Sequence, residues 1–218
     1  MKTTESMPGA SLNALFIGNS FTARNDVPGL IAGLAAAHGL RFGHRLIQAG
    51  GASLRQHWNK GEAQRLMREA RFDYVVLQEQ STLPVKNAAR MHENIRLFDA
   101  AIRETGARTA LYLTWARQNA PDTQAAITAA YLAIGAELCA SVIPVGVAWQ
   151  NFLQKHPRPI LHDKDLSHPT LAGSYLAACV FFAALFGRNP VGTASELKGL
   201  APADIAALQT AAWAATQK

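Results

Sequence analysis

Short apolar runs alternate with longer helix-forming segments along nearly the whole sequence, and this alternation constrains the fold most strongly. Five runs are bounded by turn residues and predict strands at residues 13–18, 42–51, 73–81, 107–115 and 141–149. Strands that alternate with helices pair in parallel, because a helical crossover carries the chain back to the edge where the previous strand began. The sequence therefore predicts an α/β fold with a mainly parallel five-stranded sheet and helices on both faces.

The segments between and after these runs carry helix signals. Residues 27–39 place a proline in the first turn and a glycine at the C-terminal end, positions that favour each residue. Further helices are expected within residues 54–70, 87–106 and 122–140, and after Pro169 and Pro202. The fifth apolar run contains Pro144, which indicates a strand at a sheet edge or one with a bulge.

The composition is that of an ordinary folded protein. Of the 218 residues, 49% are hydrophobic and 17% charged, a balance that favours a full core over disorder. We expect one domain over residues 1–218, with a core at about 13–187 and a C-terminal helix at about 202–216. The formal net charge is +6, but the basic residues are spread along the chain without an adjacent block. We therefore expect no nucleic-acid partner.

The apolar stretches and the cysteines predict neither a membrane anchor nor a disulfide. Residues 170–187 form the most apolar run, but polar interruptions near its start favour a buried core helix. Cys139 and Cys179 lie in Ala-rich helical stretches, which predicts two buried free thiols. Residues 1–13 contain no apolar core of signal-peptide length, so a cytoplasmic location is the default expectation. A secreted or periplasmic location is expected if a signal segment has been removed.

Three small polar clusters follow the first three predicted strands. They are Gly18-Asn19-Ser20, Gly50-Gly51 and Gln78-Glu79-Gln80-Ser81. The carboxyl ends of parallel strands meet at one edge of the sheet, where α/β proteins bind their ligands. Ser20 at this edge is a turn former, a helix cap or a nucleophile. The late segment that contains Asp165 and His168 would have to reach the same edge.

A serine nucleophile needs a base, and the base needs a group that orients it. Asp165 and His168 are three residues apart, a spacing that lets the carboxylate accept from one ring nitrogen while the other faces a substrate. Asp163 is a rival orienting carboxylate. Acyl transfer also needs hydrogen-bond donors for an oxyanion. The candidate donors are the backbone amide of Ser20, a backbone amide of Gly50 or Gly51, and the side-chain amide of Gln78 or Gln80.

Other residues near this edge allow other interpretations. Trp115 ends the fourth predicted strand and could stack on a sugar, or it could belong to the core. His57 and Trp58 could line a substrate pocket or pack in a helix, and Glu79 receives no role. A metal could be bound by the histidines and carboxylates of the late loop, which are His162, Asp163, Asp165 and His168. No phosphate-binding glycine loop followed by Lys-Ser or Lys-Thr occurs.

The ordered motifs resemble those of the SGNH hydrolases, also called GDSL-type esterases and lipases. The first block of that family corresponds to Gly18-Asn19-Ser20-Phe21, the second to Gly50 or Gly51, and the fifth to Asp165-Leu166-Ser167-His168. The family's third block, Gly-x-Asn-Asp, is replaced here by LQEQS. The resemblance spans about residues 15–187. Within the family, the sequence is similar to a bacterial branch with GNSFT, VVLQEQS and HPT..GSYLAAC motifs.

This resemblance implies a flavodoxin-like three-layer sandwich and a cofactor-free serine esterase that works through an acyl-enzyme. It implies Ser20 as nucleophile, His168 as base and Asp165 as its orienting acid, with Gly50 or Gly51 and Gln78 or Gln80 in the oxyanion hole. The substrates it implies are small acyl esters, including acetyl groups on a carbohydrate. A saccharide-binding module without catalysis on the same fold is the alternative, because the third block is altered and the chain is basic. A metal-dependent phosphoester hydrolase is a third possibility.

Overall fold

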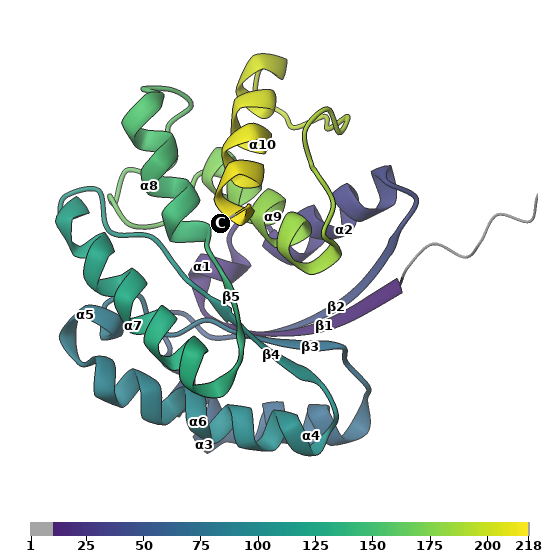
Figure 1. The fold of residues 1–218 in the computed structure, drawn as a ribbon, viewed down its shortest axis with the longest axis vertical. Helices are drawn as coiled ribbons and strands as arrows, with labels where there is room; N and C mark the ends of the chain where they lie inside the picture. The colour runs from purple at the N-terminus through teal and green to yellow at the C-terminus, as the bar shows by residue number, and fades with distance from the viewer. Residues whose placement is uncertain (1–10, 218) are drawn as a thin grey trace, which may run out of the picture.

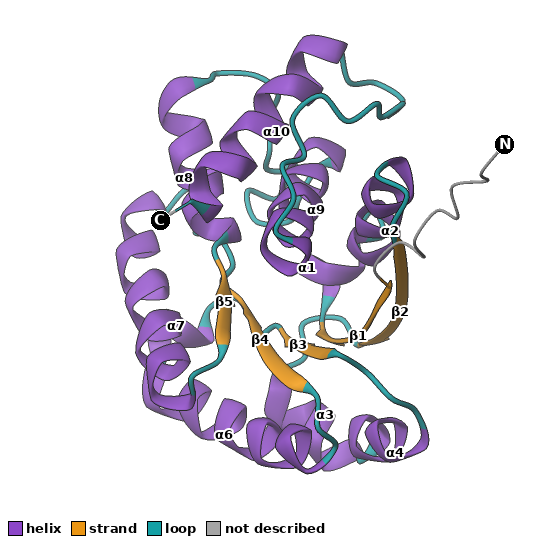
Figure 2. Cartoon of the chain, turned by 45° about the vertical axis from the view of Figure 1, so that its right-hand side comes forward, coloured by secondary structure: helices purple, strands orange, loops and turns teal. Residues whose placement is uncertain are grey.

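The computed structural model describes residues 11–217 and contains a five-stranded parallel sheet. The strands are β1 (Ser11–Gly18), β2 (Arg41–Gln48), β3 (Tyr74–Leu77), β4 (Arg108–Tyr112) and β5 (Ser141–Ile143). Their order across the sheet is β2-β1-β3-β4-β5, and every neighbouring pair is parallel (Figures 1 and 2). The predicted α/β fold class is confirmed, and β5 lies at a sheet edge as its proline indicated.

Helices cover both faces of the sheet, which makes three layers (Figure 1). One face carries α1 (Ser20–Ala23), α2 (Val27–Ala37), α8 (Val145–Lys155), α9 (Leu171–Phe186) and α10 (Pro202–Thr216). The other face carries α3 (Leu54–Lys60), α4 (Glu62–Glu69), α5 (Leu83–Lys86), α6 (Ala88–Glu104) and α7 (Gln124–Leu138), which is preceded by a 3₁₀ turn at Pro121–Thr123.

Alternation along β1 explains why both faces are covered. Ala14 and Phe16 point into the core below α2 and α9, whereas Leu15 and Ile17 point into the core on the α6 side. All four side chains are buried. A strand that is apolar on both faces requires a helical layer on each side. Helix α9 is apolar nearly all round and is buried between α2, α8 and α10.

The fifth apolar run is where the sequence prediction is wrong. The strand covers only Ser141–Ile143, and Pro144 then leads into α8. A proline cannot donate to a sheet ladder but is tolerated at the start of a helix. The buried residues Val145, Ala148, Trp149 and Phe152 follow helical spacing, so the signal for α8 was present in the sequence.

Two smaller differences concern helix ends. The helical segment predicted over residues 54–70 is broken at Gly61, whose φ of +73° separates α3 from α4. Cys139 caps the C-terminus of α7 in a left-handed conformation and is exposed, so the prediction of a buried thiol is wrong there. Cys179 within α9 is buried as predicted, and both thiols are free.

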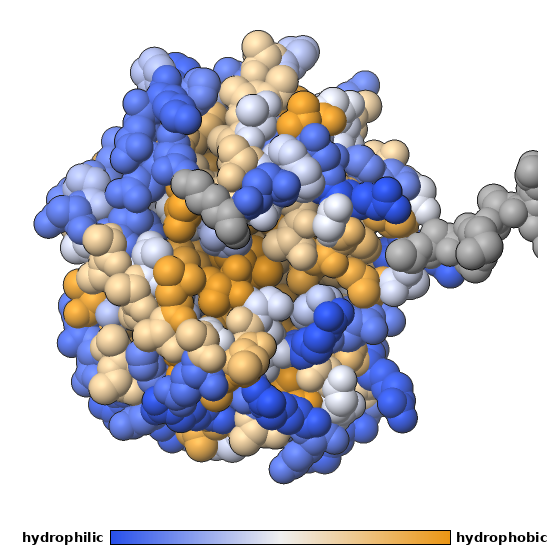
Figure 3. All heavy atoms as spheres, viewed as in Figure 1, coloured by the Kyte–Doolittle hydropathy of each residue, from blue (hydrophilic) through white to orange (hydrophobic). Residues whose placement is uncertain are grey.

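The surface is mixed in character. On the face in Figure 3, hydrophilic residues dominate the periphery, and apolar residues gather near the middle, around the β5 edge of the sheet. Within residues 11–217, no helix is both long enough and apolar enough to cross a membrane.

Candidate active site

Ser20 is placed by the tight connection between β1 and α1. Asn19 is the N-cap of α1, because its side-chain oxygen accepts a hydrogen bond from the Phe21 amide at 3.1 Å. The other end of the Asn19 side chain donates to the Ala52 carbonyl at 3.1 Å, which fixes the turn against the loop after β2. Since Asn19 performs the capping, the hydroxyl of Ser20 is left to another partner.

The preceding Gly18 is required by close packing. A Cβ atom at this position would lie 2.6 Å from Gln78 Oε1 and 2.9 Å from Thr22 Oγ1. His57, which is buried, donates from Nε2 to the Gly18 carbonyl at 2.8 Å. Burial lowers the pKa of His57, so the ring is neutral at pH 7. The sequence allows pocket lining or helix packing for His57, and the structure shows packing.

His168 connects Ser20 to Asp165. Its Nε2 lies 2.7 Å from Ser20 Oγ, and its Nδ1 forms a hydrogen bond with Asp165 Oδ2. Asp165 Oδ1 also accepts from the backbone amides of His168 at 2.9 Å and Ser167 at 3.0 Å. These hydrogen bonds, first that from the His168 amide, hold the pKa of Asp165 far below its ordinary value. The ionised carboxylate keeps the proton of a neutral ring on Nδ1, so Nε2 accepts from the Ser20 hydroxyl.

The loop that carries Asp165 and His168 is tied to the rest of the protein on several sides. His162 and Pro169 form an antiparallel bridge at its base. Trp115 Nε1 donates to the Ser167 carbonyl at 3.0 Å, and the Gln118 amide donates to the Leu166 carbonyl at 2.8 Å. The loop therefore rests on the segment that follows β4.

Asp163 and His162, which belong to the same loop, have partners other than His168. Asp163 pairs with Arg24 at 2.6 Å, which links the loop to the end of α1 and leaves Asp165 as the partner of His168. His162 donates from Nε2 to the Ala116 carbonyl at 3.0 Å, and its burial lowers its pKa. Residues 11–217 contain no group of three or more side chains arranged to hold a metal ion.

The two glutamines after β3 have different surroundings. Gln78 is fully buried, and its Oε1 accepts from the Asn19 amide at 2.8 Å and from Thr22 Oγ1 at 3.1 Å. Its Nε2 donates to the Glu79 carbonyl, so both ends of this side chain are occupied. Gln80 uses only its oxygen, which accepts from the amides of Thr82 at 2.9 Å and Leu83 at 3.1 Å. Its side-chain NH₂ has no acceptor among residues 11–217.

The backbone amides predicted for an oxyanion hole are likewise unoccupied. Gly50 and Gly51 form an exposed turn after β2, and Gly51 has a φ of +65°. Neither their amides nor that of Ser20 donates to another residue in the described part of the chain. The first amides of a helix have no intrahelical acceptor, which explains the free amide of Ser20.

Trp115 does not lie where a sugar could stack on it. It is 1% exposed, and its ring is sandwiched between Phe21 at 4.6 Å and Trp149 at 4.0 Å. The expectation that it lines the pocket is therefore corrected: both ring faces are already covered. Strand β4 ends at Tyr112, so Trp115 lies three residues past the strand and not at its end.

Comparison with known proteins places this geometry in a known fold. No protein-family model and no curated protein matches the sequence. A DUF4886 family protein from Bacteroides uniformis superposes with a TM-score of 0.80 at 22% identity over 94% of both chains. A Slackia heliotrinireducens protein classed as an SGNH hydrolase superposes with a TM-score of 0.71 at 24% identity, over 80% of this chain and 99% of that one.

The chain has the SGNH hydrolase fold. The acetyl-xylooligosaccharide esterase Axe2 from Geobacillus also shares it, with a TM-score of 0.64 at 16% identity over 87% of this chain and 99% of the other. The predicted resemblance in fold is thus confirmed. This chain has LQEQS in place of Gly-x-Asn-Asp, the third block of the SGNH hydrolases. Gln80, whose side-chain NH₂ is free within the described residues, belongs to this segment.

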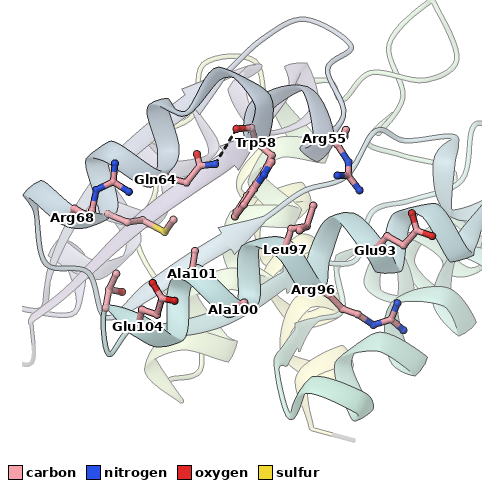
Figure 4. Close-up of a pocket in the computed structure, with 12 residues that line it drawn as sticks. Arg55, Trp58, Gln64, Arg68, Glu93, Arg96, Leu97, Ala100, Ala101 and Glu104 are labelled. Atoms are coloured by element: carbon pink, nitrogen blue, oxygen red, sulfur yellow. Dashed lines mark hydrogen bonds between the residues drawn. The ribbon is translucent and has the colours of Figure 1, made fainter.

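One hollow on the described surface is separate from Ser20 and His168. It is a groove of about 900 Å³ between α3–α4 and α6, lined by Arg55 and Trp58 among others (Figure 4). Trp58 packs edge-on against Phe98 at 5.2 Å between ring centres. Ser20 and His168, which are 148 residues apart in the sequence, meet at the carboxyl edge of the sheet instead.

Proposed function

We propose that this protein is a serine esterase that hydrolyses carboxylic esters through an acyl-enzyme. The observation that carries the proposal is the hydrogen-bonded series Ser20–His168–Asp165. A serine becomes a useful nucleophile when an oriented imidazole takes its proton. An acyl-transfer site further needs donors directed at the developing oxyanion, and the amides of Ser20, Gly50 or Gly51 and Gln80 supply them.

The first half of the proposed reaction acylates Ser20. Oγ attacks the ester carbonyl carbon while His168 Nε2 takes its proton, and Asp165 stabilises the resulting imidazolium. The carbonyl oxygen becomes an oxyanion that accepts from the free amides. As the tetrahedral intermediate collapses, the bond to the alcohol oxygen breaks and His168 returns the proton to that oxygen. The products are an alcohol and acyl-Ser20.

The second half releases the acid. A water molecule gives a proton to His168 and attacks the acyl carbon, which forms a second oxyanion in the same place. Collapse breaks the bond to Oγ, and the proton returns from His168 to Ser20. The proposed cycle uses no cofactor.

For the substrate we propose small acyl esters, with acetyl groups on a carbohydrate as the first class to test. Gly50 and Gly51 are exposed, so this edge of the proposed site is open to solvent. The fold shared with the acetyl-xylooligosaccharide esterase Axe2 supports this choice.

The test compares hydrolysis of p-nitrophenyl acetate by the wild type and by Ser20→Ala. We expect kcat to fall by at least about 10³, because the three residues act as a unit. Ser141→Ala, at an exposed position on β5, is the matched control and should keep wild-type activity. An equal slow rate in all three folded proteins would contradict the esterase. Titration with acetylated and deacetylated oligosaccharides would then test the alternative of a binding module.

A further inference from the structure

Glu79 is a carboxylate in an unusual place. It is the second residue after β3, and it is 0% exposed. An ionised carboxylate loses its hydration on burial, which costs much free energy unless donors replace the water. The reaction proposed above gives this residue no part.

Three donors meet the buried carboxylate. Oε1 accepts from the Gln80 amide at 2.7 Å and from the Leu54 amide at 3.0 Å. Oε2 accepts from Asn94 Nδ2 at 2.8 Å. Leu54 begins α3, immediately after the loop that contains Gly50 and Gly51. One carboxylate therefore joins the two segments that carry the candidate oxyanion donors.

The orientation of Asn94 indicates that Glu79 is ionised. Arg55 Nε donates to Asn94 Oδ1 at 3.0 Å, and a guanidinium can only donate. The oxygen of Asn94 must therefore face Arg55, which turns its NH₂ toward Glu79. Burial raises the pKa of Glu79, but the hydrogen bonds from Asn94, Gln80 and Leu54 oppose this effect. Every partner of the carboxylate is a donor, as an ionised group requires.

We infer that Glu79 is the positioning residue of the oxyanion hole, an inference that rests on the proposed esterase function. It does not touch the reacting atoms. It holds the backbone of Gln80 and the start of α3 at a set separation. This separation would let the side-chain NH₂ of Gln80 and a backbone amide of Gly50 or Gly51 converge on one oxygen. Oxyanion donors act only from a fixed distance, and a displacement of about 1 Å can cost about 10² in rate.

Figure 4 shows where this network reaches the surface. Arg55 stands at one end of the groove between α3 and α6, opposite Glu93. Asn94 is 1% exposed and lies between Arg55 and Glu79. Arg55 is thus linked to the buried carboxylate of Glu79 by two hydrogen bonds through the Asn94 side chain. Substitution of Arg55, which is partly exposed, perturbs the network with less risk to folding than substitution of Glu79.

The main variant is Glu79→Gln, which keeps the shape and the Oε1 acceptor but sets the NH₂ groups of residues 79 and 94 against each other. We expect kcat for p-nitrophenyl acetate to fall by about 10 to 10², with KM changed by less than about threefold. The double variant Glu79→Gln/Asn94→Asp exchanges acid and amide, which restores each donor–acceptor pair. It should recover kcat to within a few fold of the wild type.

A double-mutant cycle of Glu79→Gln and Gln80→Ala separates a positioning role of Glu79 from a general loss of structure. If Glu79 acts through Gln80, then Glu79→Gln adds little to the loss caused by Gln80→Ala. Arg55→Ala is the second variant if Glu79→Gln does not fold, and we expect a smaller fall in kcat with the same pattern. Affinity for a boronic acid, which forms a tetrahedral adduct with the serine, should fall in parallel with kcat.

The outcomes distinguish failure of the positioning role of Glu79 from failure of the proposed esterase function. Absence of Ser20-dependent turnover in the wild type overturns both. Ser20-dependent turnover with an unchanged kcat in folded Glu79→Gln and Arg55→Ala overturns the positioning role alone. Fully additive effects of Glu79→Gln and Gln80→Ala overturn the action through Gln80, because independent losses would show that Glu79 does not act through that side chain.

Discussion

The exposed edge of the site and the layer directly beneath it are built in opposite ways. His168 and Asp165 come from a surface loop, and their side chains are 27% and 45% exposed. Below them, Gln78, Glu79 and Trp115 are almost wholly buried, and their polar atoms are hydrogen-bonded. The groups that are proposed to react with substrate are therefore accessible, whereas the buried polar groups beneath them fix the positions of the segments that carry those groups.

The buried layer also explains how a long loop can hold a hydrogen bond with Ser20. Phe21 follows the proposed nucleophile and stacks on Trp115, whose indole NH holds the Ser167 carbonyl. The two segments that must meet, α1 and the late loop, thus share one support. This arrangement reduces the conformational freedom that Ser20 and His168 would otherwise lose in each catalytic cycle.

Asp165 and Asp163 are the two carboxylates of the exposed loop. We expect the largest change in kcat for Asp165→Asn. Loss of the orienting carboxylate leaves His168 free to adopt the wrong tautomer, and kcat should fall by about 10³ to 10⁴. Asp163→Asn is the matched control, because Asp163 pairs with Arg24 and should change kcat by only a few fold. Steady-state kinetics with p-nitrophenyl acetate measure both. A larger loss for Asp163→Asn would reverse the assignment.

The next effect separates an accessible glutamine from a buried one. Gln80→Ala should lower kcat by about 10² to 10³, the usual cost of one oxyanion donor. Gln78→Ala should instead lower the free energy of unfolding by about 1–3 kcal/mol, because it leaves buried partners unsatisfied. Urea denaturation and steady-state kinetics on both variants give the comparison. A catalytic loss confined to Gln78→Ala would show that the wrong amide has been assigned.

A third variant tests whether Trp115 packs in the core or stacks on a sugar substrate. Trp115→Ala should lower the free energy of unfolding by about 3–5 kcal/mol, because it empties the space between two stacked rings. The ratio of kcat/KM for acetylated oligosaccharides to that for p-nitrophenyl acetate should stay within a few fold in the folded fraction. A selective loss for the sugar ester would place Trp115 in the substrate site.

The smallest effect concerns the buried neutral histidines, His57 and His162. Their lowered pKa values mean that the unfolded chain binds protons more readily than the folded one. Their contribution to stability is therefore present above about pH 6.5 and is lost as pH falls below it, by at most about 1.4 kcal/mol per pH unit for each ring. Urea denaturation between pH 5 and pH 8 (about the range in which histidine titrates) should show a shallower slope for His57→Gln. The same slope in both proteins would contradict the prediction.

The sheet and the proposed triad could be predicted because their signals are local or follow from topology. Alternating apolar runs determine a parallel sheet, and parallel strands bring Ser20 and the glycine turn to one edge. Asp165 and His168 are close in sequence, so their contact follows from a turn. The boundary between β5 and α8 was missed because a β-branched run outweighed the helical spacing that begins at Val145.

The roles of Gln78, Gln80 and Trp115 could not be assigned in advance. Strand β3 ends at Leu77, so the alternation that tells one side of a strand from the other is lost at these glutamines. Trp115 similarly lies past the end of β4, where only tertiary packing decides its direction. Glu79 carried no sequence signal beyond its place among amides, since its partners Leu54 and Asn94 are distant in the chain.

The most direct measurement of the central claim is mass spectrometry of the protein after treatment with a fluorophosphonate, which phosphonylates activated serines. We expect one adduct per chain, located at Ser20 by peptide mapping, absent from Ser20→Ala and formed far more slowly in His168→Ala. Labelling at another serine, or no labelling of the folded wild type, would contradict this expectation.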